Sequence, residues 1–275
     1  MKTFVDLFSG AGGLTHGLRQ AGWQPLLGVD IWPEATATYL RNFTDHKVVT
    51  RGVGDITAAE WARLVPSQPD WIVGGPPCQG FSTIGKRQKS DPRNQLFREF
   101  AYVIRLIRPQ NFLIENVLGL KDMKFVDKVA AHLGALGYQV SCHVLTAADF
   151  GVPQLRRRVV FVGDLGGKAL QEPIPTHQTS NYVSVLDAIG DLPPLSLGEE
   201  ATAYLTAPKN PYQRKLRRGS KVIQGHVCSK HPASLVEAIS HIPDGGSRRS
   251  IPVHLQPKSG FHNSYSRLNS RAPAV

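Results

Sequence analysis

One cysteine lies in a setting suited to nucleophilic chemistry. Cys78 is part of the run GGPPCQGFS, residues 74–82, and follows the apolar segment 71–73. That segment predicts a short buried strand, which the Gly and Pro residues end. Each proline fixes its own φ angle, so the loop that presents the thiol is stiff. A thiol on a rigid loop at the carboxyl end of a strand is placed like a covalent nucleophile, and we favour this over a structural core cysteine.

A carboxylate and two guanidinium groups are predicted to line the same crevice. Segment 111–117 predicts a strand, and Glu115 follows three apolar residues near its carboxyl end. Gln154, Arg156 and Arg158 alternate along the chain, so in one extended strand their side chains would share a polar, cationic face. We interpret that face as part of a crevice, the alternative being a solvated edge strand.

The start of the chain has the strand–turn–helix order of a nucleotide site. The apolar segment 3–8 runs into the glycine turn 9–13 and then into a helical pattern. A second strand ends on Asp30, which is placed to accept hydrogen bonds from ribose hydroxyls or to cap the next helix. Asp55, taken alone, is a cap for the helix predicted at 58–64. The turn lacks the G-x-G-x-x-G spacing, so a nicotinamide dehydrogenase is disfavoured.

Composition narrows the class of protein. The chain has 275 residues, with 32 Lys and Arg against 21 Asp and Glu, a net charge of +11. The excess is +3 in residues 1–150 and +8 in residues 151–275, so the second half is the expected face for a polyanion. Cys78, Cys142 and Cys228 form neither a disulfide framework nor a metal motif, and we predict Cys142 to be a core residue. We see no signal peptide or membrane span and expect a cytoplasmic protein.

Four motifs together resemble the DNA (cytosine-5)-methyltransferases of restriction–modification systems. They are DLFSGAGGLTHGL at 6–18, the cysteine loop, Glu115-Asn116-Val117, and the Q-x-R-x-R pattern at 154–158. The resemblance implies an α/β fold with a doubly wound, mostly parallel sheet, Rossmann-like, of the class I S-adenosylmethionine-dependent methyltransferases. It also implies a smaller, irregular target-recognition domain. We therefore expect a catalytic and cofactor-binding domain at 1–176 and a recognition region at 177–275.

The resemblance also assigns site residues. It makes Cys78 the catalytic nucleophile and Glu115 the group that grips the target base, with Gln154, Arg156 and Arg158 contacting the base and nearby sugar-phosphate. It implies no metal. The expected contacts to S-adenosylmethionine are Phe8, Ser9, Gly10, Ala11, Gly13, Asp30, Ile31, Asp55, Ile56, Gly75, Pro77 and Leu96.

These residues imply covalent chemistry on a cytosine that has left the double helix. Addition of a thiolate from Cys78 to C6 makes C5 nucleophilic toward a sulfonium methyl group. Glu115 suits hydrogen bonding at N3, and Arg158 suits the O2 oxygen, where negative charge develops. This geometry cannot be reached inside a stacked duplex, so the base must be flipped out.

The second half is expected to bind double-stranded DNA. Its composition shifts toward Pro, Ser, Asn and clustered basic residues, which can neutralise phosphates and reach base edges. A solvated charged surface is the competing interpretation for each side chain. The expected DNA contacts are Ser82, Arg214, Lys215, Arg217, Arg218, Arg248 and Arg249.

Three alternatives remain open from the sequence. Segment 264–275 resembles the beginning of the ninth family motif, and the tenth motif does not follow. We therefore consider a truncated chain, an incomplete sequence, or one subunit of a split methyltransferase that a second chain completes, and we expect this chain alone to be weakly active or inactive. A tRNA cytosine-5 methyltransferase is a second possibility, disfavoured by the residues after Cys78. A non-catalytic DNA-binding protein is a third, disfavoured by the retained site residues.

Overall fold

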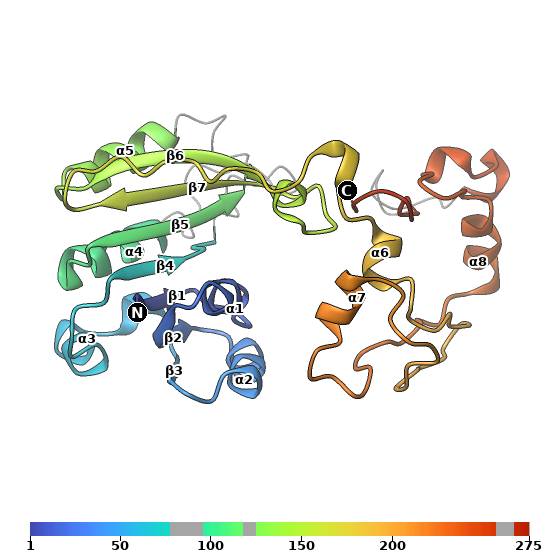
Figure 1. The fold of residues 1–275 in the computed structure, drawn as a ribbon, viewed down its shortest axis with the longest axis horizontal. Helices are drawn as coiled ribbons and strands as arrows, with labels where there is room; N and C mark the ends of the chain where they lie inside the picture. The colour runs from blue at the N-terminus through green and yellow to red at the C-terminus, as the bar shows by residue number, and fades with distance from the viewer. Residues whose placement is uncertain (78–95, 118–124, 257–266, 275) are drawn as a thin grey trace. The chain divides into compact units, whose positions relative to one another are not determined.

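A computed structural model describes residues 1–77, 96–117, 125–256 and 267–274 (Figure 1). Strands and helices alternate through the first part of the chain, as the hydrophobic pattern predicts. The elements of this part are β1 (Thr3–Leu7), α1 (Gly13–Gln20), β2 (Gln24–Asp30), α2 (Pro33–Asn42), β3 (Lys47–Thr50), the 3₁₀ turn η1 (Val53–Asp55), α3 (Ala58–Leu64), β4 (Trp71–Gly74), α4 (Leu96–Ile107), β5 (Asn111–Val117), α5 (Phe125–Gly134), β6 (Gln139–Thr146), the 3₁₀ turn η5 (Ala147–Phe150) and β7 (Arg157–Asp164).

Within the described residues, seven strands form one sheet in the order β3-β2-β1-β4-β5-β7-β6. The first five strands in this order are parallel to one another, and β7 is antiparallel to β5. The strand order reverses between β1 and β4, which is where ligands bind in open α/β sheets. The sheet is thus the mostly parallel, Rossmann-like sheet expected for the class I methyltransferases.

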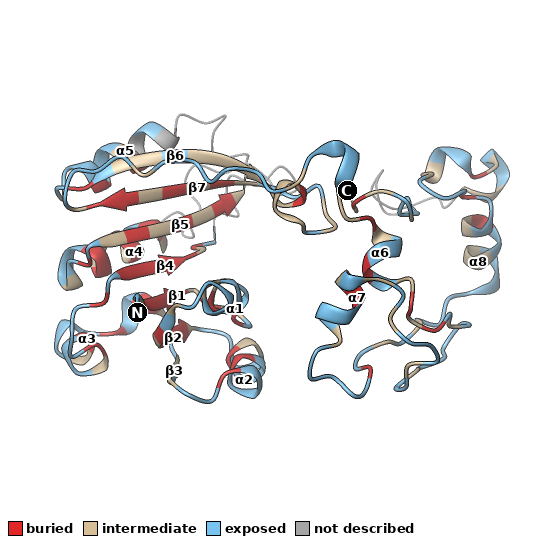
Figure 2. Ribbon diagram, in the orientation of Figure 1, coloured by how far each residue is buried: buried red, intermediate tan, exposed pale blue. Residues whose placement is uncertain are grey.

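Helices cover the sheet on both faces because alternate residues of the central strands point to opposite sides. On one face, Val5 and Leu7 of β1 belong to a large core that also contains buried side chains of α3, α4 and α5. On the other face, Phe4 and Val73 pack against Leu18 of α1. Strands β1 and β4 are buried along nearly all of their length (Figure 2). This two-sided burial explains why their sequences are almost continuously apolar.

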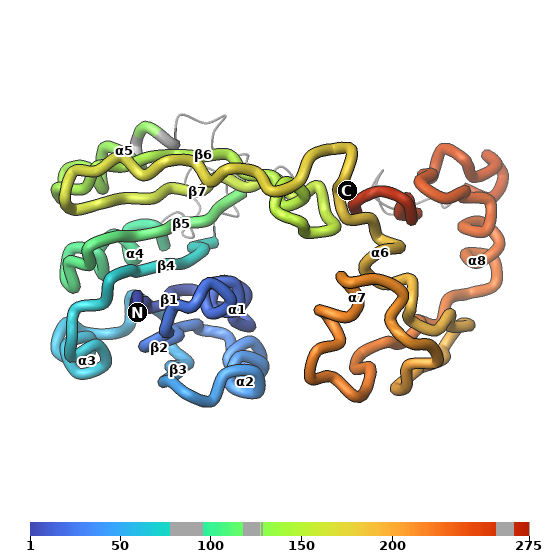
Figure 3. Tube along the Cα trace, in the orientation of Figure 1, coloured from blue at the N-terminus to red at the C-terminus, as the bar shows by residue number. Residues whose placement is uncertain are grey.

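The chain divides into two compact units. The first contains residues 1–145 and 157–173, and the second contains residues 146–156 and 174–275. The segment 146–156 therefore groups with the second unit, although it falls inside the expected first domain, 1–176. The second unit follows a largely irregular path between short helices (Figure 3). Its elements after residue 174 are η6 (Thr179–Asn181), α6 (Val185–Ile189), α7 (Pro211–Leu216), α8 (Ala233–Ser240), η7 (Arg248–Ser250) and η8 (Val253–Leu255).

Two local expectations are wrong. Cys142 is exposed on β6, at the edge of the sheet, and is not a core residue. The segment 154–158 is not one extended strand, because β7 begins only at Arg157. Gln154 instead forms an isolated parallel bridge with Ala274 in the second unit. The alternating polar side chains of 154–158 therefore belong to two different elements, the bridge at Gln154 and strand β7.

Candidate active site

The carboxyl ends of four parallel strands meet at one edge of the first unit. Leu7 of β1 pairs in register with Val29 of β2 and with Gly74 of β4, and Gly74 pairs with Ile114 of β5. The residues that follow these positions are the glycine turn, Asp30, the loop before Cys78, and Glu115. The topology therefore brings the described parts of the predicted motifs to the same edge of the sheet.

The side chain of Asp30 binds the backbone of the glycine turn. The backbone N–H of Gly10 donates to Asp30 Oδ2 at 2.8 Å, and the N–H of Trp32 donates to Asp30 Oδ1 at 2.9 Å. Phe8 has a φ of 55°, an uncommon conformation for a residue with a side chain, which is found preferentially at functional sites. Asp30 thus fixes the turn and the start of α2 together, and each of its oxygens retains a further lone pair for a ligand.

Asp55 does not cap the following helix. Thr57 caps α3, in a capping box with Glu60. Asp55 ends η1 with its side chain exposed, while the neighbouring Ile56 is fully buried. The turn is fixed to α4, because the N–H of Gly54 donates to Glu99 Oε2 at 3.0 Å. Burial raises the pKa of the Glu99 carboxyl, and the nearby charge of Asp55 adds to this.

Two apolar side chains stand in solvent beside Asp30. Ile31 is 67% exposed and Trp32 is 70% exposed, which is unusual for residues of their size. Leu96, also predicted in this site, begins α4 and is half-buried. The sequence analysis named Ile31 but not Trp32, whose exposure only the structure shows. Exposed apolar groups next to a carboxylate are suited to a ligand with a flat ring and a sugar.

Glu115 is paired with Arg158. Arg158 Nε lies 2.8 Å from Glu115 Oε1, and the antiparallel register of β5 and β7 brings the two side chains together. Both are partly accessible, with side-chain exposures of 23% for Arg158 and 32% for Glu115. Gly75 lies against this pair, since a Cβ added at Gly75 would be 3.1 Å from Glu115 Oε2. A carboxylate and a guanidinium are thus fixed next to the loop that leads to residue 78.

The loop before Cys78 is anchored to β5. The side-chain amide of Asn116, which is buried, donates from Nδ2 to the backbone oxygen of Pro76 at 2.9 Å. This contact ties the stretch 75–77 to the residue next to Glu115. Cys78 and Ser82 lie outside the described residues. Sequence reasoning assigned no role to Asn116, although an amide beside a site carboxylate was the available signal.

The family model for C-5 cytosine-specific DNA methylases matches residues 2–238. This chain belongs to that family. It is 39% identical over 99% of its length to the type II methyltransferase M1.HphI of Haemophilus parahaemolyticus, and 38% identical over 95% to M.DdeI of Desulfomicrobium norvegicum. It spans 69% and 66% of those two relatives. A prophage-encoded E. coli protein described as a DNA modification methyltransferase has the same fold, with a TM-score of 0.76 at 23% identity.

Gln154 and Arg156 of the family pattern belong to the second compact unit. Leu155, between them, donates its backbone N–H to Ala274 O at 2.6 Å, and Arg156 O accepts from Ala147 N at 2.9 Å. Only Arg158 of the three predicted polar residues lies on β7. The pattern Q-x-R-x-R thus straddles the boundary between the units.

The basic residues expected to contact DNA differ in how they are held. Arg214, Lys215 and Arg218 are exposed on α7 or just after it. Arg217 instead pairs with the buried carboxylate of Asp191 at 2.5 Å. Its guanidinium also donates to Thr206 O at 2.7 Å and lies 3.7 Å from the centre of the Tyr204 ring. The structure therefore gives Arg217 an internal role that the sequence did not distinguish from its neighbours. Arg248 and Arg249 lie in η7.

Lys215 borders a cavity of about 440 Å³ in the second unit. Tyr182, Tyr212, Asn181 and Asn210 also line this cavity. The lining also includes the carboxylate of Asp187, so the hollow carries both an anion and a cation beside the aromatic rings and amide groups.

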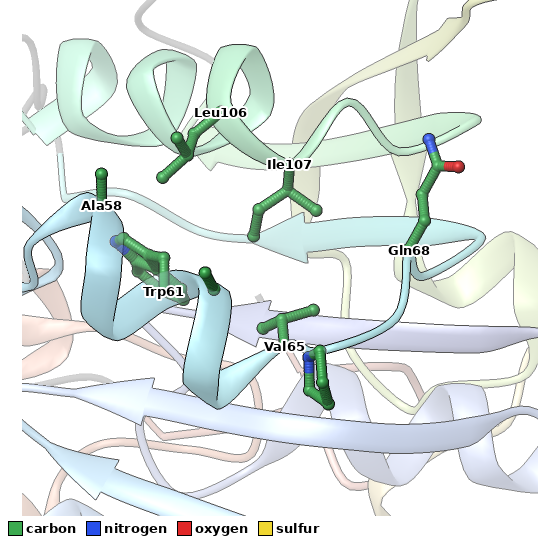
Figure 4. Close-up of a pocket in the computed structure, with 8 residues that line it drawn as sticks. Ala58, Trp61, Val65, Gln68, Leu106 and Ile107 are labelled. Carbon is green, nitrogen blue, oxygen red and sulfur yellow. The ribbon is translucent and has the colours of Figure 1, made fainter.

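A second cavity lies in the first unit, at the opposite edge of the sheet from the glycine turn. It measures about 260 Å³ and lies between α3 and the end of α4 (Figure 4). None of the residues that line it is acidic or basic; they are Ala58, Trp61, Ala62, Val65, Pro66, Gln68, Leu106 and Ile107.

Among the described residues, no three His, Cys, Asp or Glu side chains gather as a metal site. The described helices include none long and apolar enough to cross a membrane.

Proposed function

We propose that this chain methylates C5 of a flipped-out cytosine in double-stranded DNA through a covalent adduct between Cys78 and C6. The observation that carries the proposal is the 2.8 Å pair of Glu115 and Arg158, next to the loop that precedes Cys78. Asn116 anchors that loop to the same strand. A nucleophile, a hydrogen-bonding acid and a guanidinium are the three groups that this reaction requires of a protein.

Each of these side chains acts on a different atom of the ring. The Cys78 thiolate forms the bond to C6, and the electron pair of the C5–C6 double bond moves toward C5. Glu115, when it carries a proton, donates a hydrogen bond to N3 and draws electron density from the ring, and Arg158 binds O2, where negative charge develops. Loss of the C5 proton and departure of the thiolate then restore the double bond. The pairing of Arg158 with Glu115 holds both groups in place before the base arrives, which lowers the cost of reorganisation.

The glycine turn and its surroundings fit S-adenosylmethionine. Ser9 Oγ is buried and has no hydrogen-bond partner among the described residues, so it calls for a polar ligand atom. A Cβ added at Gly10 or Gly13 would meet nothing within 4 Å, so a ligand can approach the backbone there. Asp30 would accept from the ribose hydroxyls, Ile31 would pack on the adenine, and Asp55 would accept from its amino group. Bound there, S-adenosylmethionine supplies an electrophilic methyl group.

The second unit would supply DNA contacts that offset the cost of flipping. Unstacking a base costs a few kcal/mol, and contacts between basic side chains and phosphates provide binding energy that falls steeply with salt. The exposed Arg214, Lys215, Arg218 and Arg249 suit this role. Gln154 and Arg156 would support the sugar-phosphate near the target base.

Trapping on DNA that contains 5-fluorocytosine tests the proposal. Fluorine cannot leave from C5 as a proton does, so the adduct persists and can be seen by denaturing electrophoresis. We expect an adduct with duplex DNA that forms only when S-adenosylmethionine is present. Cys78→Ser should abolish this adduct but retain DNA binding. Cys142→Ser is the matched control, because Cys142 is exposed on β6 and should leave the adduct intact.

Two outcomes would overturn the assignment. An adduct that survives Cys78→Ser would exclude this residue as the nucleophile. Adduct formation with a tRNA substrate but not with duplex DNA would move the function to the RNA-directed alternative. A parallel titration of DNA binding against salt should show a steep loss of affinity, because phosphate contacts release counterions.

A further inference from the structure

A carboxyl group is buried directly before the glycine turn. Asp6, on β1, has no exposed surface. Its Oδ2 lies 2.7 Å from Thr15 Oγ1, while its Oδ1 is buried and has no hydrogen-bond partner among the described residues. An ionised carboxylate with one unpaired oxygen in the core is costly, and a neutral carboxylic acid in that place costs far less. Burial raises the pKa of Asp6 to about 7; the Thr15 hydrogen bonds oppose this and the charge of Asp30 adds to it.

A chain of hydrogen bonds leads from Asp6 to the protein surface. Thr15 Oγ1 lies 2.7 Å from Tyr39 Oη, which lies 2.8 Å from His46 Nε2. His46 Nδ1 lies 3.0 Å from Asp45 Oδ1. Asp45 is half exposed, and its Oδ1 also forms an ion pair with Arg19 Nη1 at 2.7 Å. The chain therefore joins β1, α1 and α2 to the loop before β3.

Proton counting gives the chain a direction. Asp45 is ion-paired with Arg19 and can only accept, so His46 carries its proton on Nδ1. A neutral His46 then accepts at Nε2 from Tyr39, and Tyr39 accepts from Thr15. Toward an ionised Asp6 the Thr15 hydroxyl is the donor. In the direction followed here the Thr15 proton is used toward Tyr39 instead, so Thr15 accepts from Asp6, and this requires a protonated Asp6. The reverse direction contains the same number of protons but places an ionised carboxylate in the core and an imidazolium at His46.

The chain of hydrogen bonds contacts the glycine turn through the ring of Tyr39. A Cβ added at Gly12 would lie 2.5 Å from Phe43 Cε2 and 3.0 Å from Tyr39 Cδ2, and one added at Gly28 would lie 3.0 Å from Tyr39 Cζ. The ring thus fits between the turn and β2 only because both positions lack a side chain. Gly12 also has a φ of 91°, which favours glycine. A shift of the Tyr39 ring would therefore move the turn that Asp30 holds at Gly10.

We propose that Asp6 is a protonated carboxylic acid and that Asp6, Thr15 and Tyr39 are positioning residues for the glycine turn. The effect on cofactor affinity rests on the proposed function, in which the turn binds S-adenosylmethionine. The charged groups that face the chain are Asp30 near Asp6, and Arg19 and Asp45 at its outer end. As pH rises and Asp6 ionises, the chain must reverse or break, and cofactor binding should weaken.

Matched phenol deletions test the positioning role. Tyr39→Phe keeps the ring but breaks the chain. Tyr138→Phe removes another buried phenol, whose hydroxyl donates to Pro109 O at 2.6 Å elsewhere in the first unit. Calorimetric titration with S-adenosylmethionine should show roughly tenfold weaker binding for Tyr39→Phe and no change for Tyr138→Phe, the loss expected when a buried polar group is left unpaired. Equal losses in the two variants would overturn the positioning role.

Asp6→Asn tests the protonation state, because its amide donates to Thr15 as a carboxylic acid does. We expect Asp6→Asn to bind the cofactor as the wild type does at pH 6, and to keep that affinity at pH 8.5, where the wild type is several-fold weaker. Weak binding by Asp6→Asn at pH 6 would show that a carboxylate is required, and would refute the proposal.

Infrared spectroscopy separates this inference from the proposed function. In D₂O at pH 6, the wild type should show a carbonyl stretch of a protonated carboxyl group that is absent from Asp6→Asn. Absence of this band from the wild type would refute the proposal. Its presence in a protein that binds no S-adenosylmethionine would uphold the protonated Asp6 and refute the cofactor assignment alone.

Discussion

Replacing Asp6 by asparagine should stabilise the first unit at neutral pH and change how its stability depends on pH. In the unfolded chain the carboxyl ionises near its ordinary pKa of 3.8, whereas in the folded protein burial raises the pKa to about 7. Between these values the folded state holds a proton that the unfolded state has lost. Stability therefore falls as pH rises through this window and is constant above about 7.

The magnitude follows from the shift of the pKa. A displacement from 3.8 to about 7 corresponds to about 4 kcal/mol at 25 °C, since each unit is worth about 1.4 kcal/mol. Asp6 has no exposed surface, so solvent screening does not reduce this figure. The side chain introduced by Asp6→Asn has no ionisation to suppress and keeps the donor to Thr15. The variant should thus match the wild type near pH 4 and exceed it by about 4 kcal/mol above pH 7.

Urea unfolding of both proteins, followed between pH 4 and pH 8.5, measures the difference. Asp164→Asn is the matched control of opposite sign, because the backbone N–H of Lys168 and the side chains of Gln110 and Asn111 lower the pKa of Asp164. That carboxylate stabilises the fold at neutral pH, so its replacement should be destabilising there. A difference between wild type and Asp6→Asn that stays flat with pH, or that shows the variant to be weaker at pH 8, would refute the account of Asp6.

Two further predictions concern contacts that the sequence did not reveal. Arg217→Ala should destabilise the second unit by about 3 kcal/mol in thermal unfolding, because Asp191 would remain buried without its cation, whereas Arg214→Ala should leave the melting temperature unchanged and weaken DNA binding. Equal melting temperatures for the two variants would contradict the internal role of Arg217. Asn116→Ala should slow single-turnover methylation roughly tenfold, since Pro76 O loses its donor and the loop before Cys78 loses its anchor. An unchanged methylation rate would contradict the anchoring role of Asn116.

Strands and helices of the first unit were predictable because each has a local signal. Hydrophobic runs ended by Gly, Pro or an acid gave β5 at 111–117 and α3 at 58–64 at the same bounds that the structure shows. The carboxyl ends of parallel strands then had to meet at one edge, which placed the glycine turn, Asp30 and Glu115 together. The pair of Glu115 and Arg158 follows from this topology once β7 lies beside β5.

Other contacts were not predictable because they join residues whose separation along the chain carries no pattern. Glu99 binds Gly54 across 45 positions, and Asn116 binds Pro76 across 40. The alternation at 154–158 misled for a related reason. Period-2 spacing predicts a shared face only within one strand, and here the strand begins at Arg157.

The role of Asp6 was not predicted from the sequence, although Asp6 is part of the motif that the sequence analysis singled out. Asp6 opens the DLFSG run, where the glycines attract attention as the part that touches a ligand. An acid in an apolar strand contradicts the pattern around it, and such a conflict is kept only where it is compensated. The compensation lies in Thr15 and Tyr39, with Gly12 and Gly28 making room for the tyrosine ring. The glycines of this region therefore differ in their surroundings, because an added Cβ would meet nothing within 4 Å at Gly10 and would meet aromatic side chains at Gly12.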